Sequence, residues 1–469
     1  MLLSAGASSF RVKDGMARLA KAVGIKEHHA SVTYTEITAT AYANGTFRTE
    51  LAEQRVMGVN ADRIDSLNRF VTSLPEHMLV EDAERELDTI AARKALYSPF
   101  ISSLASGFAC AGFCFLNHGG LVECAAVSFA AFFGQLLRRF LMKRRMNHFG
   151  VWMLCGMAAV AIYIIQVMAL QKFGIIGMSH ESGVVSAVLF LVPGFPLVTS
   201  ILDLIRQDFS AGISRGTYVA MLLISSAVAV WATTALFSWD VADTVAGYHL
   251  TPAVLFAARA VATFFAAFGF AMLFNAPLRA CALAAVIGAL INTGRLTAQD
   301  ANLNSLAAVG LAALCAGLLA HVVSGRSRYS RVTLSVPAVV VMIPGVPLYR
   351  AITAINNGEV GNALSEVVTV ILVIASIGVG LAVARMATDR NWLMDELKSV
   401  PSLGDSRSTI PSIFTRGEFA DLSPRARAAE RPFPAEHAAA AKHTATVQSN
   451  AREVSETTKA SETTKKMSH

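Results

Sequence analysis

The sequence predicts a mainly α-helical membrane protein in which ten transmembrane helices form two inverted five-helix repeats behind a small α+β domain. Three observations carry this prediction. The chain of 469 residues has a mean hydropathy of +0.49, with 54% hydrophobic and only 16% charged residues, which is too apolar for a soluble protein of this size. Ten apolar windows have the length that a bilayer core requires. Two copies of a Pro-Gly motif lie about 151 residues apart.

Residues 1–96 are mixed in polarity and predict a small cytosolic domain that combines helices with a β-hairpin. The segment MARLAKAVGIKE has apolar residues at helical spacing. SVTYTEITATAY is rich in β-branched and aromatic residues, and Asn44-Gly45 is a strong hairpin signal before TFRTEL returns as a second strand. Asn60 is placed to cap the next helix, and LVEDAERELDTIAARKAL predicts a further amphipathic helix.

The ten apolar windows follow between Tyr97 and Arg385, each about 18 to 25 residues long. The first and second windows, and the sixth and seventh, have tight connections that predict helical hairpins. We expect spans near 98–116, 119–141, 150–171, 183–205, 215–238, 252–273, 277–294, 302–323, 333–355 and 361–384.

The charges of the short loops predict the orientation of these spans. The most basic loops, RRFLMKRR from Arg138 and GRSRYSR from Gly325, lie on one side if ten spans alternate, and the loop from Asp240 carries no Lys or Arg. Basic loops stay in the cytoplasm, so we expect a multi-pass protein of the inner membrane with both termini cytoplasmic. We divide the rest of the chain into two five-span halves and a disordered cytosolic tail, at 97–240, 250–386 and 387–469.

The two apolar halves contain matching motifs. VPGFPLVTSI from Val192 matches IPGVPLYRAI from Ile343, and GFCFLNHGGLVEC from Gly112 matches GFAMLFNAPLRAC from Gly269 at nearly the same offset. Repetition of this kind indicates two related halves. Because five is an odd number, the second half enters the membrane from the opposite side. Inverted halves are typical of secondary transporters.

Each Pro-Gly motif interrupts an apolar span, because proline removes a backbone donor and collides with the preceding turn. In lipid the freed carbonyl and N–H groups need partners, so breaks in equivalent helices indicate a substrate site near the bilayer midplane, where a positive half-helix end suits a carboxylate. A kink used only for packing is the simpler alternative, and two kinks at matched positions make it less favoured. The predicted break residues are Pro193, Gly194, Pro344 and Gly345.

Charged residues near the membrane supply the remaining candidates. Arg259 lies well inside the sixth window and is predicted to bind the substrate's carboxylate, with pairing to an acid as the structural alternative. Asp203 is the candidate for the ammonium group or for a coupling proton. His118, Asp208 and Glu359 are further candidates for proton coupling, although solvation at a turn or at the membrane interface explains each of these acids and the histidine as well.

Other chemistries find little support in the sequence. It contains no GxxxxGK[ST] loop, nucleophile elbow or set of residues at metal-ligand spacing, so we expect no enzyme activity, no catalytic residue, no metal and no cofactor. The six cysteines lie in or beside apolar segments without CxxC pairs and are interpreted as packing residues or free thiols. The formal charge of +7 follows from the basic loops and tail. Expected partners are a small zwitterion, the lipid bilayer and further copies of the chain, and no nucleic acid.

Several ordered segments resemble the threonine/serine exporter family. The N-terminal ones are LLSAGASSFRVKDGMARLAKAVG, SVTYTEITATAY and MGVNADRIDSLNRFV, and those in the membrane are LVPGFPLVTSILDLIRQDFSAGISRG, GFAMLFNAPLRACALAAVIGAL and VPAVVVMIPGVPLYRAITAI. The likeness covers about residues 2 to 386. It implies a ten-span inner-membrane exporter with a cytosolic N-terminal domain that moves L-threonine and L-serine outward, driven by the proton motive force and, we expect, by alternating access.

Two alternatives remain open. Some members of the family divide the halves between separate chains and are associated with export of succinate-like dicarboxylates, and two cations such as Arg259 and Arg350 suit two carboxylates. The fused halves favour the amino-acid branch. A membrane-anchored sensor or scaffold, whose N-terminal domain binds a cytosolic partner, is less favoured because inverted broken helices have little use in an anchor.

Overall fold

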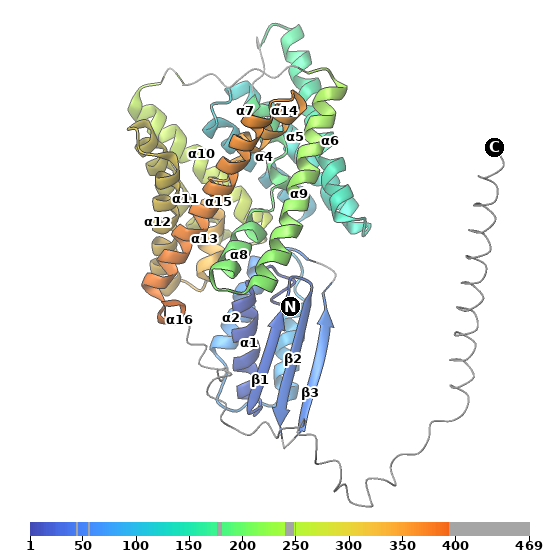
Figure 1. Ribbon diagram of the computed structural model, residues 1–469, viewed down its shortest axis with the longest axis vertical. Helices are drawn as coiled ribbons and strands as arrows, with labels where there is room; N and C mark the ends of the chain where they lie inside the picture. Colours follow the sequence, from blue (N-terminus) through green and yellow to red (C-terminus); the bar gives the residue numbers. More distant parts are fainter. Residues whose placement is uncertain (44–45, 55–56, 176–180, 240–247, 249, 394–469) are drawn as a thin grey trace, which may run out of the picture. The chain divides into compact units, whose positions relative to one another are not determined.

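A computed structural model describes residues 1–43, 46–54, 57–175, 181–239, 248 and 250–393 of the chain. The fold is mainly helical, with a small sheet near the N-terminus (Figure 1). The predicted turn at Asn44-Gly45, most of the loop from Asp240 and nearly all of the predicted tail lie outside the described residues.

The N-terminal domain combines three helices with a three-stranded antiparallel sheet in the order β1-β2-β3. Its elements are α1 (Ser9–Ala22), β1 (Glu27–Val32), β2 (Glu36–Ala43), β3 (Thr46–Glu53), α2 (Ala61–Thr72) and α3 (Val80–Ala91). Asn60 caps α2 as predicted, because its Oδ1 accepts the Arg63 N–H at 3.1 Å. Both helices expected after the hairpin are therefore present.

The sheet has one strand more than the sequence indicated. The segment SVTYTEITATAY was expected to be one strand, but it divides between the end of β1 and most of β2, with Val32 paired to Ile37 across the turn. The Thr33 hydroxyl accepts the Glu36 N–H at 3.0 Å and holds this turn. β1 itself was missed because its polar His28-His29 pair lacks the expected composition of a strand.

Within the described residues, helices follow the N-terminal domain at each of the ten windows that the sequence predicted, but not all of them qualify as membrane spans. Eight are single helices long and apolar enough to span a bilayer. These are α4 (Pro99–Leu116), α5 (Leu121–Lys143), α6 (His148–Lys172), α9 (Phe209–Leu236), α10 (Pro252–Leu273), α11 (Leu278–Asp300), α12 (Ser305–Arg326) and α15 (Val360–Thr388). The chain is therefore a multi-pass membrane protein, and the short α16 (Arg390–Leu393) closes the described part.

The two remaining windows are the interrupted ones. The ninth consists of α13 (Arg331–Val340) and α14 (Gly345–Asn356), which are bent by 49° at the break. The fourth contains α7 (Glu181–Ala187), the 3₁₀ turn η1 (Leu189–Leu191) and α8 (Gly194–Ile205), a shorter apolar helix. Neither Pro193 nor Pro344 lies within an unbroken helix.

The two halves repeat one another in detail. Residues 157 apart correspond between α4–α6 and α10–α12, and residues 151 apart correspond between α7–α9 and α13–α15. We call such residues equivalent. Three pairs of equivalent residues at helix ends share a positive φ angle: His118 with Asn275, Arg145 with Asn302, and Gln207 with Gly358. At both breaks the glycine N–H donates to the carbonyl two residues earlier.

Helices α4 and α10 are equivalent and cross each other in opposite directions. A Cβ atom on Gly112, late in α4, would lie 2.5 Å from the carbonyl oxygen of Ala262, early in α10. A Cβ atom on the equivalent Gly269 would lie at the same distance from the carbonyl oxygen of Ala105. Phe108 contacts its own equivalent, Phe265, with ring centroids 6.1 Å apart. Reciprocal contacts of this kind are the signature of a two-fold axis, here perpendicular to the helices.

Candidate functional site

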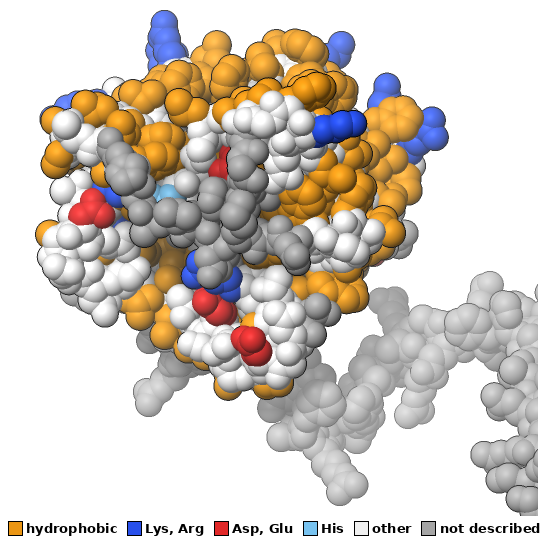
Figure 2. Space-filling view, turned by 90° about the horizontal axis from the view of Figure 1, so that it is seen from above, with side chains coloured by type: hydrophobic (Ala, Val, Ile, Leu, Met, Phe, Trp, Pro, Cys, Tyr) orange, Lys and Arg blue, Asp and Glu red, His pale blue; other side chains and the backbone are white. Residues whose placement is uncertain are grey.

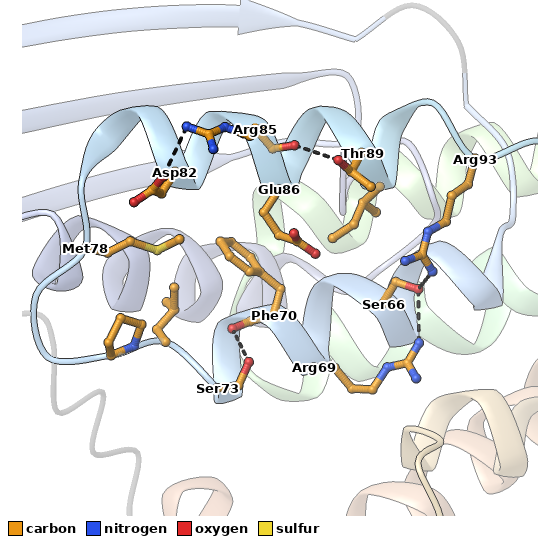
Figure 3. Close-up of a pocket in the computed structure, with 13 residues that line it drawn as sticks. Ser66, Arg69, Phe70, Ser73, Met78, Asp82, Arg85, Glu86, Thr89 and Arg93 are labelled. Atoms are coloured by element: carbon orange, nitrogen blue, oxygen red, sulfur yellow. Dashed lines mark hydrogen bonds and ion pairs between the residues drawn. The ribbon is translucent and has the colours of Figure 1, made fainter.

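Two cavities compete as the functional site. The first, of about 740 Å³, lies within the N-terminal domain between α2 and α3 (Figure 3). There Arg69 and Arg93 both donate to the Ser66 hydroxyl, while Asp82 pairs with Arg85 at 3.3 Å. Its charged side chains are mostly exposed and already paired locally, and it contains no residue of the membrane helices. A transport site must be reached from those helices, so this cavity is the weaker candidate.

The second cavity, of about 330 Å³, lies beside the break between η1 and α8. Pro193 and Pro196 line one wall, and α5 and α6 contribute another through Arg138, Arg139 and Trp152. Residues of the N-terminal domain and the α10–α11 hairpin complete the lining. Small-molecule sites occur preferentially in such clefts, where a few polar groups converge among apolar side chains. The cavity is therefore our candidate functional site.

Side chains of α5 and α6 provide partners for the backbone groups that the break leaves free. The Arg138 guanidinium donates to the Phe190 carbonyl at 2.9 Å, and the Trp152 indole N–H donates to the Leu191 carbonyl at 2.6 Å. Arg138 also lies over the Trp152 ring, 4.9 Å from its centroid. A carbonyl without a partner in lipid costs several kcal/mol, so these contacts make the interrupted helix possible.

The cavity carries positive charge without a carboxylate to balance it. Arg138 and Arg139 line it, His148 lies nearby and bonds the Tyr218 hydroxyl at 2.7 Å, and no Asp or Glu is part of the lining. Neither arginine forms an ion pair with any of the residues that the structure describes. Partly buried cations without a charged partner favour an anionic ligand, so the cavity is suited to a ligand with a carboxylate.

The expected span 119–141 includes Arg138 and Arg139, but sequence reasoning missed them as site residues because it interpreted the segment RRFLMKRR as a basic loop. Both arginines belong to α5, which continues for more than a turn to Lys143. The signal was present in the order of residues: Phe140-Leu141-Met142 after the two arginines is apolar and continues the helix. Trp152 and His148 had no comparable signal.

The predicted break residues occupy different positions. Pro193 lines the cavity, and Gly194 follows it against the second half, where an added Cβ would lie 2.7 Å from the Val340 side chain. A Cβ atom added to Gly345 would lie 3.6 Å from the side chain of Leu189, the equivalent of Val340. The two breaks therefore pack against one another. Pro344 precedes it as the N-cap of α14. Participation of these four residues in substrate binding stays a prediction.

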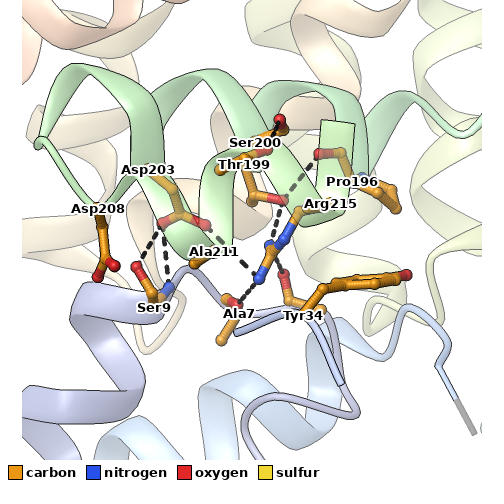
Figure 4. Close-up of polar contacts among 12 residues, drawn as sticks. Ala7, Ser9, Tyr34, Pro196, Thr199, Ser200, Asp203, Asp208, Ala211 and Arg215 are labelled. Atoms are coloured by element: carbon orange, nitrogen blue, oxygen red, sulfur yellow. Dashed lines mark hydrogen bonds and ion pairs between the residues drawn. The ribbon is translucent and has the colours of Figure 1, made fainter. Parts of the chain in front are cut away.

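Asp203 lies outside the cavity in a buried polar cluster (Figure 4). Its Oδ1 accepts the Ser9 N–H at 3.0 Å and the Ser9 hydroxyl at 2.9 Å, and Arg215 lies 3.6 Å from Oδ2. Arg215 is fully buried and also donates to the carbonyls of Gly6 and Ala7. Removing one member of a buried pair costs about 3–5 kcal/mol. These contacts hold the N-terminal segment against α8 and α9.

The other charged candidates are distributed over both ends of the bundle. Arg259 pairs with Asp300, and its side chain is only 9% exposed. Asp208 pairs with Lys13 of the N-terminal domain at 2.7 Å. Its equivalent, Glu359, is exposed and accepts a hydrogen bond from Asn362 at 2.7 Å. The roles predicted for these residues in carboxylate binding or coupling remain predictions.

His118 lies in the α4–α5 hairpin, at the position equivalent to Asn275. Its Nδ1 is buried and has no hydrogen-bond partner within the part of the chain that the structure describes. Asn275, at the other end of the bundle, lines the candidate cavity and accepts the Leu96 N–H at 2.9 Å. The histidine is therefore placed at the end of the bundle away from the N-terminal domain.

A second buried acid, Asp65 of α2, joins the N-terminal domain to α13. Its Oδ1 accepts the Ser330 N–H and the Thr333 hydroxyl, each at 2.9 Å. Burial raises the pKa of Asp65 above its ordinary value of 3.8, although these hydrogen bonds and Arg11 oppose the shift. A raised pKa means that the folded state binds the proton more tightly than the unfolded state does. The stability linked to this proton is full below pH 3.8 and is lost as the pH rises through the folded-state pKa.

Replacing Asp65 by asparagine should remove this pH dependence, because the amide keeps the accepting oxygen but does not titrate. The unfolding temperature of the unmodified protein relative to Asp65→Asn should rise as the pH is lowered from 8 towards 4. Thermal unfolding in detergent at several pH values measures this difference. Asp88→Asn, at an exposed position of α3, is the matched control. A difference that does not change with pH contradicts the assignment.

Eight apolar spans, two interrupted helices and a cationic cavity at one break define a membrane transporter. Two family models cover most of the chain. "Putative threonine/serine exporter" matches residues 1–237, and "Threonine/Serine exporter, ThrE" matches residues 259–387. The chain belongs to the threonine/serine exporter family, as the resemblance implied.

Two curated relatives match about half of the chain. One is described as "Probable succinate transporter subunit YjjP" from Escherichia coli strain K12, 26% identical over 232 residues, which is 49% of this chain and 88% of the relative. A protein of the same description from Klebsiella aerogenes is 25% identical over 233 residues, covering 49% and 87%. No solved structure matches the chain.

Proposed function

We propose that the chain is a secondary active exporter of small carboxylate-bearing metabolites, with L-threonine and L-serine as first candidate substrates. It would lie in the inner membrane with both termini cytoplasmic and use the proton motive force. Residues 1–96 would form the cytosolic domain, and 97–240 and 250–386 would form two inverted five-span halves that alternate access. Association into homo-oligomers remains part of the proposal.

The inverted arrangement is supported by the way the equivalent helices meet. The antiparallel crossing of α4 and α10 through equivalent glycines is the arrangement expected if one half is turned over relative to the other. The pairs α8–α9 and α14–α15 pack alike, as do α4–α5 and α10–α11. Packed halves of this kind can rock about a shared axis and open a site to either side in turn.

One observation carries the proposal, namely that the cavity at the first break is lined by arginines that lack a carboxylate partner among the described residues. Arginine binds a carboxylate through two parallel hydrogen bonds. Arg138 already donates one N–H to the Phe190 carbonyl, so substrate binding there is coupled to the geometry of the break. The structure would correspond to the state open towards the N-terminal domain.

A second candidate is export of dicarboxylates, and a specific observation favours it. The cavity has two arginines and no acid for an ammonium group, so a zwitterion must place its ammonium against neutral acceptors such as the tyrosine hydroxyls. A dicarboxylate has a charged partner for each end. The relatives described as succinate transporter subunits also support a dicarboxylate as the substrate.

Counterflow in proteoliposomes tests the function. Purified protein is reconstituted into vesicles loaded with unlabelled threonine or succinate, and uptake of the labelled compound is followed with and without the other as competitor. We expect exchange of threonine and serine that a proton gradient accelerates, and the strength of competition by succinate ranks the two candidate substrates. Exchange of succinate without threonine assigns the dicarboxylate function. Vesicles that exchange neither compound contradict both, and favour the sensor or scaffold.

A further inference from the structure

The arginine that supports the first break has an equivalent in the second half. Arg295 of α11 lies 157 residues after Arg138 of α5, and a polar residue precedes each arginine by one helical turn. Gln135, one turn before Arg138, donates to the hydroxyl of Ser102 in α4 at 3.1 Å. Its equivalent, Asn292, donates to the hydroxyl of Thr263 in α10 at 3.0 Å. The two halves therefore share a polar contact between equivalent helices, beside equivalent arginines.

Each half also has a second arginine at this contact, although on different helices. In the first half Arg139 of α5 donates to the Ser102 hydroxyl at 2.9 Å. In the second half Leu296 takes the position of Arg139, and Arg259 of α10 takes the position of Ser102. Each half thus carries two arginines within about one turn of this polar contact, Arg138 and Arg139 in the first half and Arg259 and Arg295 in the second. This exchange preserves the pair of positive charges.

Because α4 and α10 run antiparallel, the second pair lies at the end of the bundle away from the N-terminal domain. Figure 2 shows hydrophobic side chains over much of the rim of this end, from which several Lys and Arg side chains also project, and a histidine with some acidic and basic side chains further in. His118 belongs to the same end and lies within electrostatic range of Arg259 and Asp300. Its equivalent, Asn275, lines the candidate cavity at the opposite end.

The two arginines at this end of the bundle, Arg259 and Arg295, differ in their partners. Arg295 donates to the side-chain oxygens of Asn292 at 2.9 Å and Gln299 at 3.1 Å, and no described carboxylate pairs with it. Arg259 is bound by the carboxylate of Asp300, which contacts both of its terminal nitrogens. The Asp300 side chain is 55% exposed, and the equivalent position in the first half is Lys143. A carboxylate of the protein therefore binds Arg259, one of these two arginines, and the first half has no equivalent carboxylate.

We propose that Arg259 and Arg295 form the carboxylate site of the outward-facing state, and that Asp300 occupies this site while the cavity at the first break is open. The inference rests on the proposed transport function and names the residues of its second state. In the outward-facing state the substrate competes with Asp300 for Arg259. The competition lowers the affinity on the outside relative to the inside, which favours release there and so suits an exporter.

Sided transport assays test this assignment. Right-side-out and inside-out membrane vesicles containing the full-length protein give the KM for the external and the internal face, using whichever of threonine and succinate the unmodified protein exchanges. Arg259→Gln and Arg295→Gln should each raise the external KM about tenfold and leave the internal KM within about twofold. Arg138→Gln should instead raise the internal KM about tenfold and leave the external KM within about twofold.

Asp300→Asn separates a competing carboxylate from a structural ion pair, because the two roles predict opposite results. Loss of a competitor should lower the external KM by about two- to fivefold. Loss of a structural pair should reduce the amount of folded protein or leave the KM unchanged. Arg279→Gln, at an exposed position near the other end of α11, is the matched control.

The inference and the proposed function fail in different ways. If the unmodified protein exchanges substrate and Arg138→Gln raises the internal KM, the transport function and inner site stand. In that case, the outward-facing site alone is overturned if the external KM is unchanged in all three variants, Arg259→Gln, Arg295→Gln and Asp300→Asn. An equal rise at both faces in the arginine variants overturns it as well. Absence of exchange by the unmodified protein overturns the proposed function itself.

Discussion

Replacing Arg138 by glutamine should lower counterflow at low substrate concentration by about 10- to 100-fold. A hydrogen bond to a charged partner contributes about 1.5–3 kcal/mol, which corresponds to this range of affinity. The variant loses the cation that faces the cavity, and it weakens the bond to the Phe190 carbonyl that stabilises the break. The expected loss is therefore larger than for removal of an exposed charge. The measurement is the initial rate of labelled substrate uptake into preloaded proteoliposomes.

Two further variants show whether the effect is specific. Lys143→Gln, exposed near the end of the same helix, should transport at the rate of the unmodified protein. Arg138→Lys should fall between the two, because lysine keeps the charge but cannot bind a carboxylate through a planar fork or stack on Trp152. If Arg138→Gln retained more than half of the original rate, the cavity at the first break would not be the transport site.

Substituting valine for Gly112 or Gly269 should strongly destabilise the membrane domain. A Cβ atom at either position would lie 2.5 Å from a backbone carbonyl oxygen of the opposite helix. Backbone cannot move away as a flexible side chain can, so α4 and α10 must separate along their contact. Small residues at such crossings allow the close approach on which association of membrane helices depends. We expect the unfolding temperature in detergent to fall by several degrees, or folded protein to be lost.

The two glycine variants should also behave alike, since their positions are equivalent. Gly294→Val, in α11, is the control, because a Cβ atom there meets no other group within 4 Å. Overpacking at a tight contact usually costs about 1–3 kcal/mol or more, whereas the control should stay within about 1 kcal/mol of the unmodified protein. A large effect at Gly112 together with none at Gly269 would argue against an internal two-fold axis.

The breaks were predictable because their cause is local. Proline and glycine that occur together in an apolar window interrupt a helix. The repetition of this motif at Pro193 and Pro344 favoured a feature common to both halves over an isolated kink. The cap at Asn60 was predictable for the same reason. β1 was not, because the turn depends on one threonine hydroxyl rather than on a Gly or Pro signal.

The partners of the charged residues could not be predicted, because they are distant in the sequence. Asp203 and Ser9 are 194 residues apart, and only the fold brings them together. Arg259 was expected to have an acid as one of its possible partners, but nothing in the sequence singled out Asp300, 41 residues later. Arg138 falls within the expected span 119–141, but it was interpreted as part of a basic loop because basic residues cluster at the end of α5, where a topology signal and a binding residue look alike.

The central claim is that substrate passes through the cavity beside the break at Pro193, and a single cysteine tests it most directly. In a variant whose six native cysteines are replaced by alanine, Val192→Cys places one thiol in the cavity lining. The measurement is its rate of reaction with a membrane-impermeant maleimide. The transported compound should slow the reaction, and the modified protein should no longer exchange substrate. Reaction at an unchanged rate under saturating substrate, with full exchange by the modified protein, would contradict the claim.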